Sequence, residues 1–168
     1  MDATPTPSDG NVLPTNKLSQ VPYTGEVKQT TTEYQGIQYN LIQEGLANVI
    51  TPQEAEVFYN PVMQFNRDLS ILMIKVFAER LKKGKFTLPT ILFTLIEKKE
   101  GHNKLRILEA LSASGLRAVR YAKELPNLDV VYANDIDEKA VASIERNRDY
   151  NDIPSEKLRL LNFDAKYL

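Results

Sequence analysis

The sequence predicts an α/β fold, in which a β-hairpin and a long amphipathic helix precede a partial doubly wound parallel sheet. Apolar strand-like runs alternate with helical patterns between residues 104 and 168, which is typical of a sheet built from βαβ units. Before them, apolar residues alternate with polar ones on both sides of Gly45. Between these two regions, a stretch that starts at Asn60-Pro61 carries apolar residues at helical spacing.

The composition fits one soluble globular domain and excludes several kinds of site. The chain has 168 residues, of which 42% are hydrophobic and 26% are charged. A net charge of −1 gives no global signature of a nucleic-acid binder, although a local basic face remains compatible with it. The absence of cysteine excludes disulfides and thiolate metal sites, and the single histidine, His102, cannot form a histidine cluster. No metal site is therefore expected.

The first 32 residues predict a disordered tail, because they are rich in Pro, Thr, Ser, Asn and Gln and lack apolar periodicity. They show neither a secretory signal nor the arginine content of a typical transit peptide. No apolar run approaches the ~18 residues that a membrane span needs. We expect an intracellular protein without membrane contact, in the nucleus or cytoplasm, with the mitochondrion as an alternative.

Residues 33–103 predict an extension made of the hairpin and the helix. The hairpin covers Tyr34 to Ile50, with Gly45 at a turn position of positive φ. The helix covers 61–83, with Asn60 as its N-cap and Gly84 as its stop. Its periodic apolar residues are Val62, Phe65, Leu69, Leu72, Val76 and Phe77. The apolar run 86–96 then predicts a buried helix or strand, and the polar run EKKEGHNK a surface loop.

The helix carries a polar trio, Asn66-Arg67-Asp68, in its first turns. Two donors and one acceptor so close together could recognise a polar ligand. From the residues alone, however, we favour a solvated helix face for this trio.

The central unit runs from Lys104 to Asp135 as strand, small-residue loop, helix and strand. Its loop contains a single glycine, Gly115, which disfavours the close pyrophosphate packing of a dinucleotide-binding oxidoreductase. Glu109, at the end of the first strand, would repel a phosphate and suits a cationic ligand better. S-adenosylmethionine is such a ligand, and its ribose could donate hydrogen bonds to Asp135. A structural βαβ unit without a ligand is the alternative.

A third strand is predicted at 158–163, after a helix that Asp137 caps. Asp164 follows it, so Glu109, Asp135 and Asp164 all fall at the carboxyl ends of successive parallel strands. Ligands bind at this edge of open α/β sheets. Acids at the ends of three consecutive strands are therefore better explained by a ligand site than by chance.

Two stretches resemble the N-terminal part of the tRNA (guanine-26-N2)-dimethyltransferase family. They read VFYNPVMQFNRDLS and ILEALSASGLRAVRYAKELP, the latter followed by ANDIDEKAVASIERNRDYN, and the resemblance covers about residues 39–168. It implies a Rossmann-like class I methyltransferase fold that uses S-adenosylmethionine, with 104–168 as the first half of the cofactor-binding domain. The substrate would be the exocyclic N2 of a guanine in tRNA, which makes tRNA the partner of the full-length enzyme.

The resemblance also implies a set of cofactor contacts. Arg67 would contact the cofactor, the loop from Glu109 to Gly115 would face its methionine end, Asp135 would bind the ribose, and Asp164 would lie beside the adenine with Phe163 or Ala165 nearby. The complete predicted set is Arg67, Glu109, Ser112, Gly115, Asp135, Ile136, Asp164 and Ala165.

One family feature is missing from the 168 residues, namely an Asp/Asn-Pro-Pro/Tyr-aromatic motif that holds the target amine. No catalytic residue can therefore be assigned, and we expect the chain to be a fragment that does not methylate tRNA alone. One alternative is a stand-alone module that binds S-adenosylmethionine or a partner. Another is a truncated product that folds poorly because its third strand is an exposed sheet edge.

Overall fold

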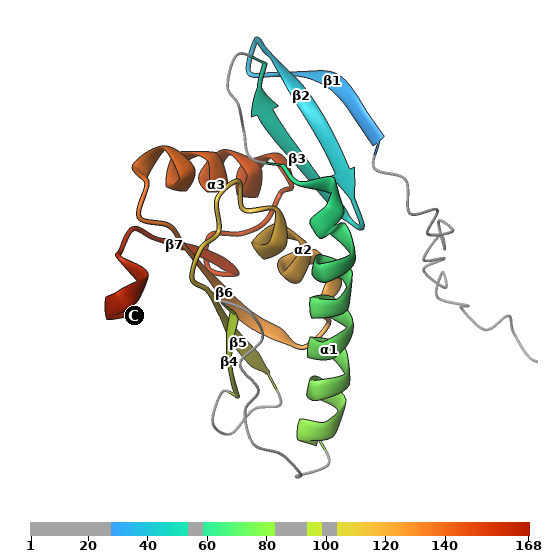
Figure 1. Ribbon diagram of the computed structural model, residues 1–168, viewed down its shortest axis with the longest axis vertical. Helices are drawn as coiled ribbons and strands as arrows, with labels where there is room; N and C mark the ends of the chain where they lie inside the picture. The colour runs from blue at the N-terminus through green and yellow to red at the C-terminus, as the bar shows by residue number, and fades with distance from the viewer. Residues whose placement is uncertain (1–27, 54–58, 83–93, 99–103) are drawn as a thin grey trace, which may run out of the picture.

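The computed structural model describes residues 28–53, 59–82, 94–98 and 104–168 (Figure 1). A three-stranded antiparallel sheet lies at one end of the molecule, and its strand order is β1-β2-β3. Its strands are β1 (Lys28–Tyr34), β2 (Ile37–Glu44) and β3 (Ala47–Pro52). The predicted hairpin is confirmed as β2 and β3, and Gly45 has the expected positive φ of 56°.

The first strand of this sheet corrects the predicted tail. The prediction that residues 28–32 are disordered is wrong, because they belong to β1 and pair with β2. Gln35 and Gly36 join the two strands with φ values of 53° and 77°, as a tight hairpin turn requires. The side chains of Gln29, Thr30 and Thr31 are exposed, so β1 has no apolar alternation for a pattern search to find. Residues 1–27 lie outside the described residues.

The predicted helix is confirmed, and it begins as predicted. A 3₁₀ turn, η1 (Pro61–Met63), leads into α1 (Gln64–Lys82). The Asn60 side chain accepts a hydrogen bond from the backbone N–H of Val62 at 3.0 Å, which satisfies a donor that the first turn leaves unpaired. The predicted stop, Gly84, lies outside the described residues.

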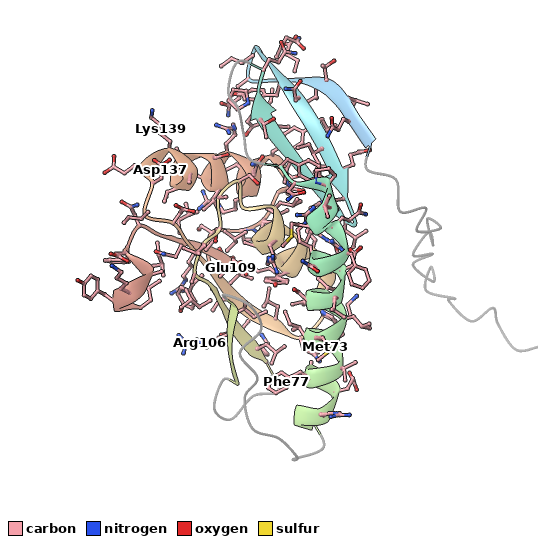
Figure 2. All side chains as sticks on the ribbon, viewed as in Figure 1. Met73, Phe77, Arg106, Glu109, Asp137 and Lys139 are labelled. Carbon is pink, nitrogen blue, oxygen red and sulfur yellow. The ribbon has the colours of Figure 1, made fainter. Side chains whose placement is uncertain are left out.

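The buried face of α1 differs from the prediction. Its buried apolar side chains are Ile71, Ile74 and Phe77, and of these only Phe77 belongs to the predicted periodic set. Figure 2 labels Phe77 on the side of α1 toward the second sheet. The other predicted positions are exposed, by fractions that range from 42% for Val76 to 81% for Val62. Apolar residues occupy both sides of this helix, so helical spacing alone could not identify the buried side.

The second sheet has four strands in the order β4-β5-β6-β7. Its elements, with the intervening helices, are β4 (Thr94–Lys98), β5 (Leu105–Glu109), α2 (Leu116–Glu124), β6 (Leu128–Asn134), α3 (Glu138–Tyr150) and β7 (Leu158–Leu161). Strands β5, β6 and β7 are parallel, which confirms the partial doubly wound sheet. The third parallel strand ends at Leu161, two residues earlier than predicted.

Strand β4 was not predicted as a partner of β5, and it runs antiparallel to it. The predicted domain boundary before residue 104 therefore cuts through this sheet. Glu97 and Lys98 belong to β4 rather than to the predicted surface loop, and 99–103, with His102, lie outside the described residues.

One hydrophobic core joins the helices to one face of the four-stranded sheet. Alternate residues of β5 point into it, as in the buried pair Leu105 and Ile107, whereas Arg106 projects on the other side of the strand (Figure 2). The core also contains Ile74 of α1, Val119 and Tyr121 of α2, Val131 of β6, Ile144 of α3 and Leu158 of β7. The helices thereby fix where the loops at the strand ends lie. Within the described ranges, no helix is long and apolar enough to cross a membrane, and no group of acidic or histidine side chains could hold a metal ion.

Candidate functional site

The three predicted acids lie at one edge of the four-stranded sheet. Glu109 is the last residue of β5, Asp135 directly follows β6, and Asp164 follows β7 after two further residues. Because these strands are parallel neighbours, their carboxyl ends meet at the same edge. The structure thus brings together the positions that the sequence predicts for a ligand.

A buried asparagine, Asn134, joins the loops that follow the three parallel strands. Its amide nitrogen donates to the carbonyl oxygens of Ala110 and Phe163, both at 2.9 Å, and its amide oxygen accepts from the N–H of Phe163. Its side chain is fully buried, so these bonds form away from water, where leaving them unmade would be costly. Sequence reasoning missed Asn134, although it directly precedes Asp135.

The small-residue loop after β5 is held by its own hydrogen bonds. Ser112 donates its hydroxyl to the Glu109 carbonyl at 3.0 Å and its N–H to the Asn134 carbonyl at 2.9 Å. Gly115 has a φ of 79°, and a Cβ placed there would meet Ile144 at 3.1 Å. The position therefore requires glycine both for its backbone and for its close approach to α3.

Asp135 holds this loop against the end of β6. One oxygen of its carboxylate accepts from the N–H of Ala113 at 2.9 Å, and the other accepts from the N–H of Asp137 at 3.1 Å. A carboxylate can accept about four hydrogen bonds, so both oxygens keep capacity for ligand hydroxyls. The backbone of Asp135 and of the exposed Ile136 is fixed in turn, because Asn162 donates to both carbonyls, at 2.8 Å and 3.1 Å.

Glu109 is buried and has a cationic partner. Its carboxylate lies 3.4 Å from the Nε of Arg117, and the same guanidinium donates to the hydroxyl of Ser70 on α1 at 2.9 Å. Figure 2 labels Glu109 in the interior of the molecule rather than on its rim. Sequence reasoning missed Arg117, which gives this edge a positive charge beside the negative one.

Arg67 lies elsewhere, in a buried ion pair. Its guanidinium donates to both carboxylate oxygens of Glu44, at 2.7 Å and 2.6 Å, and to the Asn60 carbonyl at 3.2 Å. The favoured solvated face is therefore wrong for Arg67, which is only 8% exposed. Asp68 is also paired, with Arg120 at 2.6 Å. In the part of the chain that the structure describes, these contacts do not join Arg67 to the strand-end acids.

Asp164 and Ala165 follow β7 at the same edge of the sheet. The Asp164 carboxylate accepts from the N–H of Lys166 at 3.0 Å and caps a short turn, η2 (Ala165–Tyr167). Phe163, the residue before it, is 57% exposed. The edge thus offers carboxylate acceptors together with an exposed apolar side chain, a combination that can bind a nucleoside.

Comparison with known proteins shows that this chain is similar to tRNA guanine dimethyltransferases. Residues 36–168 match the family described as N2,N2-dimethylguanosine tRNA methyltransferase. The tRNA (guanine(26)-N(2))-dimethyltransferase of Caenorhabditis elegans is 43% identical over 122 residues, which cover 67% of this chain and 22% of that protein. The mitochondrial enzyme of that name from Saccharomyces cerevisiae is 37% identical over 141 residues, covering 68% of this chain and 25% of its own length. The human enzyme of that name is 34% identical over 151 residues, which cover 70% of this chain and 23% of that protein.

Two solved structures are similar to part of this chain. Trm5b from Pyrococcus abyssi has a TM-score of 0.51 at 13% identity over 84% of this chain and 37% of its own, which supports the fold alone. A complex of Trm1 from Pyrococcus horikoshii with S-adenosyl-L-methionine has 30% identity and a TM-score of 0.47, and covers 66% of this chain and 23% of that one. The chain spans about a quarter of the length of the curated relatives described above.

Proposed function

Because the chain belongs to the N2,N2-dimethylguanosine tRNA methyltransferase family, we propose that it forms the first half of a domain that binds S-adenosylmethionine for methylation of guanine 26 in tRNA. The observation that carries the proposal is the sheet edge at which Asp135 faces the small-residue loop. An acid after the second parallel strand, beside a loop with close backbone approach, suits the ribose of a nucleoside. The complete enzyme, of which this chain would be the first part, would take tRNA as its substrate.

Each residue at this edge would contact a different part of S-adenosylmethionine. Asp135 accepts hydrogen bonds from the ribose hydroxyls, and Glu109 with the loop to Gly115 faces the positively charged methionine end. Ile136 packs against the adenine, and Asp164 and Ala165 lie along its polar edge. Arg117, which already reaches Glu109, is the cation that the geometry offers to the methionine carboxylate.

Arg67 lies outside this group of side chains. Its role as a cofactor contact is supported by the family resemblance, whereas its observed partner is Glu44. For Arg67 to contact the cofactor, its side chain would have to exchange this partner.

In the proposed reaction the cofactor supplies the methyl group, and the residues of this chain hold the cofactor in place. S-adenosylmethionine, when bound, supplies an electrophilic methyl group to the guanine amine. The chain's own residues bind and orient, because a buried carboxylate and fixed backbone groups keep the ligand in one pose. No side chain in the described ranges is assigned the removal of the amine proton, and we therefore propose that this chain alone does not methylate tRNA.

A chimera tests the catalytic part of the proposal. Residues 36–168 would replace the matching segment of the Caenorhabditis elegans relative, and transfer of labelled methyl groups to a tRNA transcript would be measured. We expect transfer to a transcript with guanine at position 26 and none to one with adenine there. A soluble, folded chimera without transfer to the guanine transcript would contradict the proposal.

A second candidate is a module that binds S-adenosylmethionine or a partner without catalysis. The same edge geometry supports it, and it predicts a ligand-binding chain whose chimera is inactive. Methylation of tRNA is an intracellular reaction, so the first candidate places the chain inside the cell. Imaging of a tagged protein would distinguish nucleus, cytoplasm and mitochondrion.

A further inference from the structure

Helix α3 completes the three-stranded sheet with two asparagine side chains. β3 is an edge strand of that sheet, so one side of its backbone lacks a neighbouring strand. Asn151 accepts from the N–H of Asn48 at 3.0 Å and donates to the Asn48 carbonyl at 2.6 Å. Asn147, one helical turn earlier, accepts from the N–H of Ile50 at 2.8 Å. The two amides thus occupy the place of a fourth strand.

The amide nitrogens of Asn147 and Asn151 donate to different parts of the molecule. The Asn147 nitrogen donates to the carbonyl of Ser114 at 2.9 Å, in the loop that follows β5. Its side chain is fully buried, so water cannot replace either hydrogen bond. One side chain therefore joins the three-stranded sheet to the loop of the candidate cofactor site.

The same helix supports the loop at a second position. Ile144, three residues before Asn147, lies so close to Gly115 that a Cβ there would meet its side chain at 3.1 Å. Asp135 contacts the loop as well, because it accepts from the N–H of Ala113 at 2.9 Å. The loop is thus held by Asp135 at Ala113 and by α3 at Ser114 and Gly115, and Asn147 supplies the polar part of the support from α3.

We propose that Asn147 is a positioning residue, which fixes the Ser114 carbonyl so that the loop 112–115 keeps the conformation that lines the cofactor site. Without this amide donor, the Ser114 carbonyl has to find another partner, and the loop has to move to reach one. The three-stranded sheet thereby becomes a support of the site rather than a separate extension. The identity of the ligand rests on the proposed function, but the link between Asn147 and the loop does not.

Substitution by aspartate separates the two bonds of Asn147. In Asn147→Asp one oxygen can still accept from Ile50, while the other replaces the donor and, in its ionised form, repels the Ser114 carbonyl. Asn151→Asp is the matched control, because it loses an amide donor on the same helix face, and that donor serves the carbonyls of Asn48 and Asn147 rather than the loop. Both variants of the 168-residue chain would be compared at pH 8.

Amide hydrogen exchange, measured by NMR, reports on the loop without any ligand. The reporter is the N–H of Gly115, which donates to the Ser112 carbonyl at 2.8 Å. We expect its exchange to be about tenfold faster in Asn147→Asp and unchanged within about twofold in Asn151→Asp. Unchanged exchange in Asn147→Asp, or an equal increase in both variants, would overturn the proposal. If Asn147→Asp does not fold, Asn147→Ala is compared with Asn151→Ala: each loses its contact with β3, and only Asn147→Ala also loses the bond to the loop.

A titration with S-adenosylmethionine then tests the consequence for binding. We expect the Kd to rise about tenfold in Asn147→Asp and to stay unchanged in Asn151→Asp. A loop that exchanges faster with an unaltered Kd would show that Asn147 does not position the site. Absence of binding by the unsubstituted chain would refute the proposed function, whereas the exchange comparison would still decide whether Asn147 holds the loop.

Discussion

The Glu44 carboxylate accepts two hydrogen bonds from the Arg67 guanidinium, from Nε at 2.7 Å and from Nη2 at 2.6 Å, in the interior between β2 and α1. Arg120 of α2 donates to the same carboxylate at 2.8 Å, and the Tyr59 hydroxyl donates to it at 3.3 Å. A single buried acid thus joins three elements that are distant in the sequence. Bidentate pairs of this kind fix geometry as well as charge.

Removal of this acid should destabilise the chain strongly. We expect Glu44→Ala to lower the free energy of unfolding by about 3 to 5 kcal/mol, because two buried guanidinium groups lose their shared partner. Urea denaturation would measure the change. The control is Glu145→Ala, whose exposed pair with Arg148 should contribute less than about 1 kcal/mol. Equal effects of the two substitutions would contradict the account.

Two glycines with similar backbone angles should respond differently to alanine. Gly36 has a φ of 77° and open space around it, whereas Gly115 has a φ of 79° and lies against Ile144. We expect Gly36→Ala to cost about 1 to 2 kcal/mol from backbone strain alone. Gly115→Ala should cost about 1 to 3 kcal/mol more, because its new methyl group overpacks the contact with α3. Thermal unfolding of both variants would test this difference, and equal losses would show that the close approach is unimportant.

The orientation of α1 gives a third prediction. Ile74 is fully buried, whereas Leu72 is 57% exposed. We expect Ile74→Ala to lower the free energy of unfolding by about 2 to 5 kcal/mol, since it leaves a cavity in the core. Leu72→Ala should change it by about 0.5 kcal/mol or less. The reverse order in urea denaturation would mean that the other face of the helix packs against the sheet.

Tyr59 gives the chain a pH dependence at alkaline pH. Burial and the nearby charge of Glu44 raise the pKa of Tyr59 from 10.0 to about 12. The folded state therefore favours the protonated phenol, so its contribution to stability is complete below about pH 10 and is lost as the pH rises through about 12. Over this interval the unsubstituted chain should lose more stability than Tyr59→Phe. Parallel losses in the two proteins, measured by urea denaturation at each pH, would exclude this role for Tyr59.

The parallel sheet and its acids could be predicted because their signals are local. Strand, small-residue loop, helix and strand follow one another within residues 104–135, and Asp135 directly follows its strand. The rule that parallel strands end at one edge then places Glu109 and Asp164 beside it. These predictions needed no knowledge of distant contacts.

The remaining contacts depend on partners that the sequence does not reveal. Arg67 looked like a solvated residue because its partner, Glu44, is 23 positions away in a different element. Asn147 gave no signal either, since asparagine on a helix is ordinarily solvated, whereas here it bonds to Ile50, 97 positions away. Strand β1 was missed because its exposed threonines lack apolar alternation. In each case tertiary contacts, rather than local patterns, determine the structure.

The central claim is that the edge of the parallel sheet binds S-adenosylmethionine through Asp135. Calorimetric titration of the 168-residue chain tests it most directly, with NAD as a comparison ligand and Asp135→Ala beside Asp149→Ala as the control for an exposed aspartate of α3. We predict saturable binding of S-adenosylmethionine, no binding of NAD, and a Kd about a hundredfold higher in Asp135→Ala, because two hydrogen bonds to a charged group are lost. Asp149→Ala should bind as the unsubstituted chain does. An unchanged Kd in a folded Asp135→Ala variant, or no binding by the unsubstituted chain, would contradict the claim.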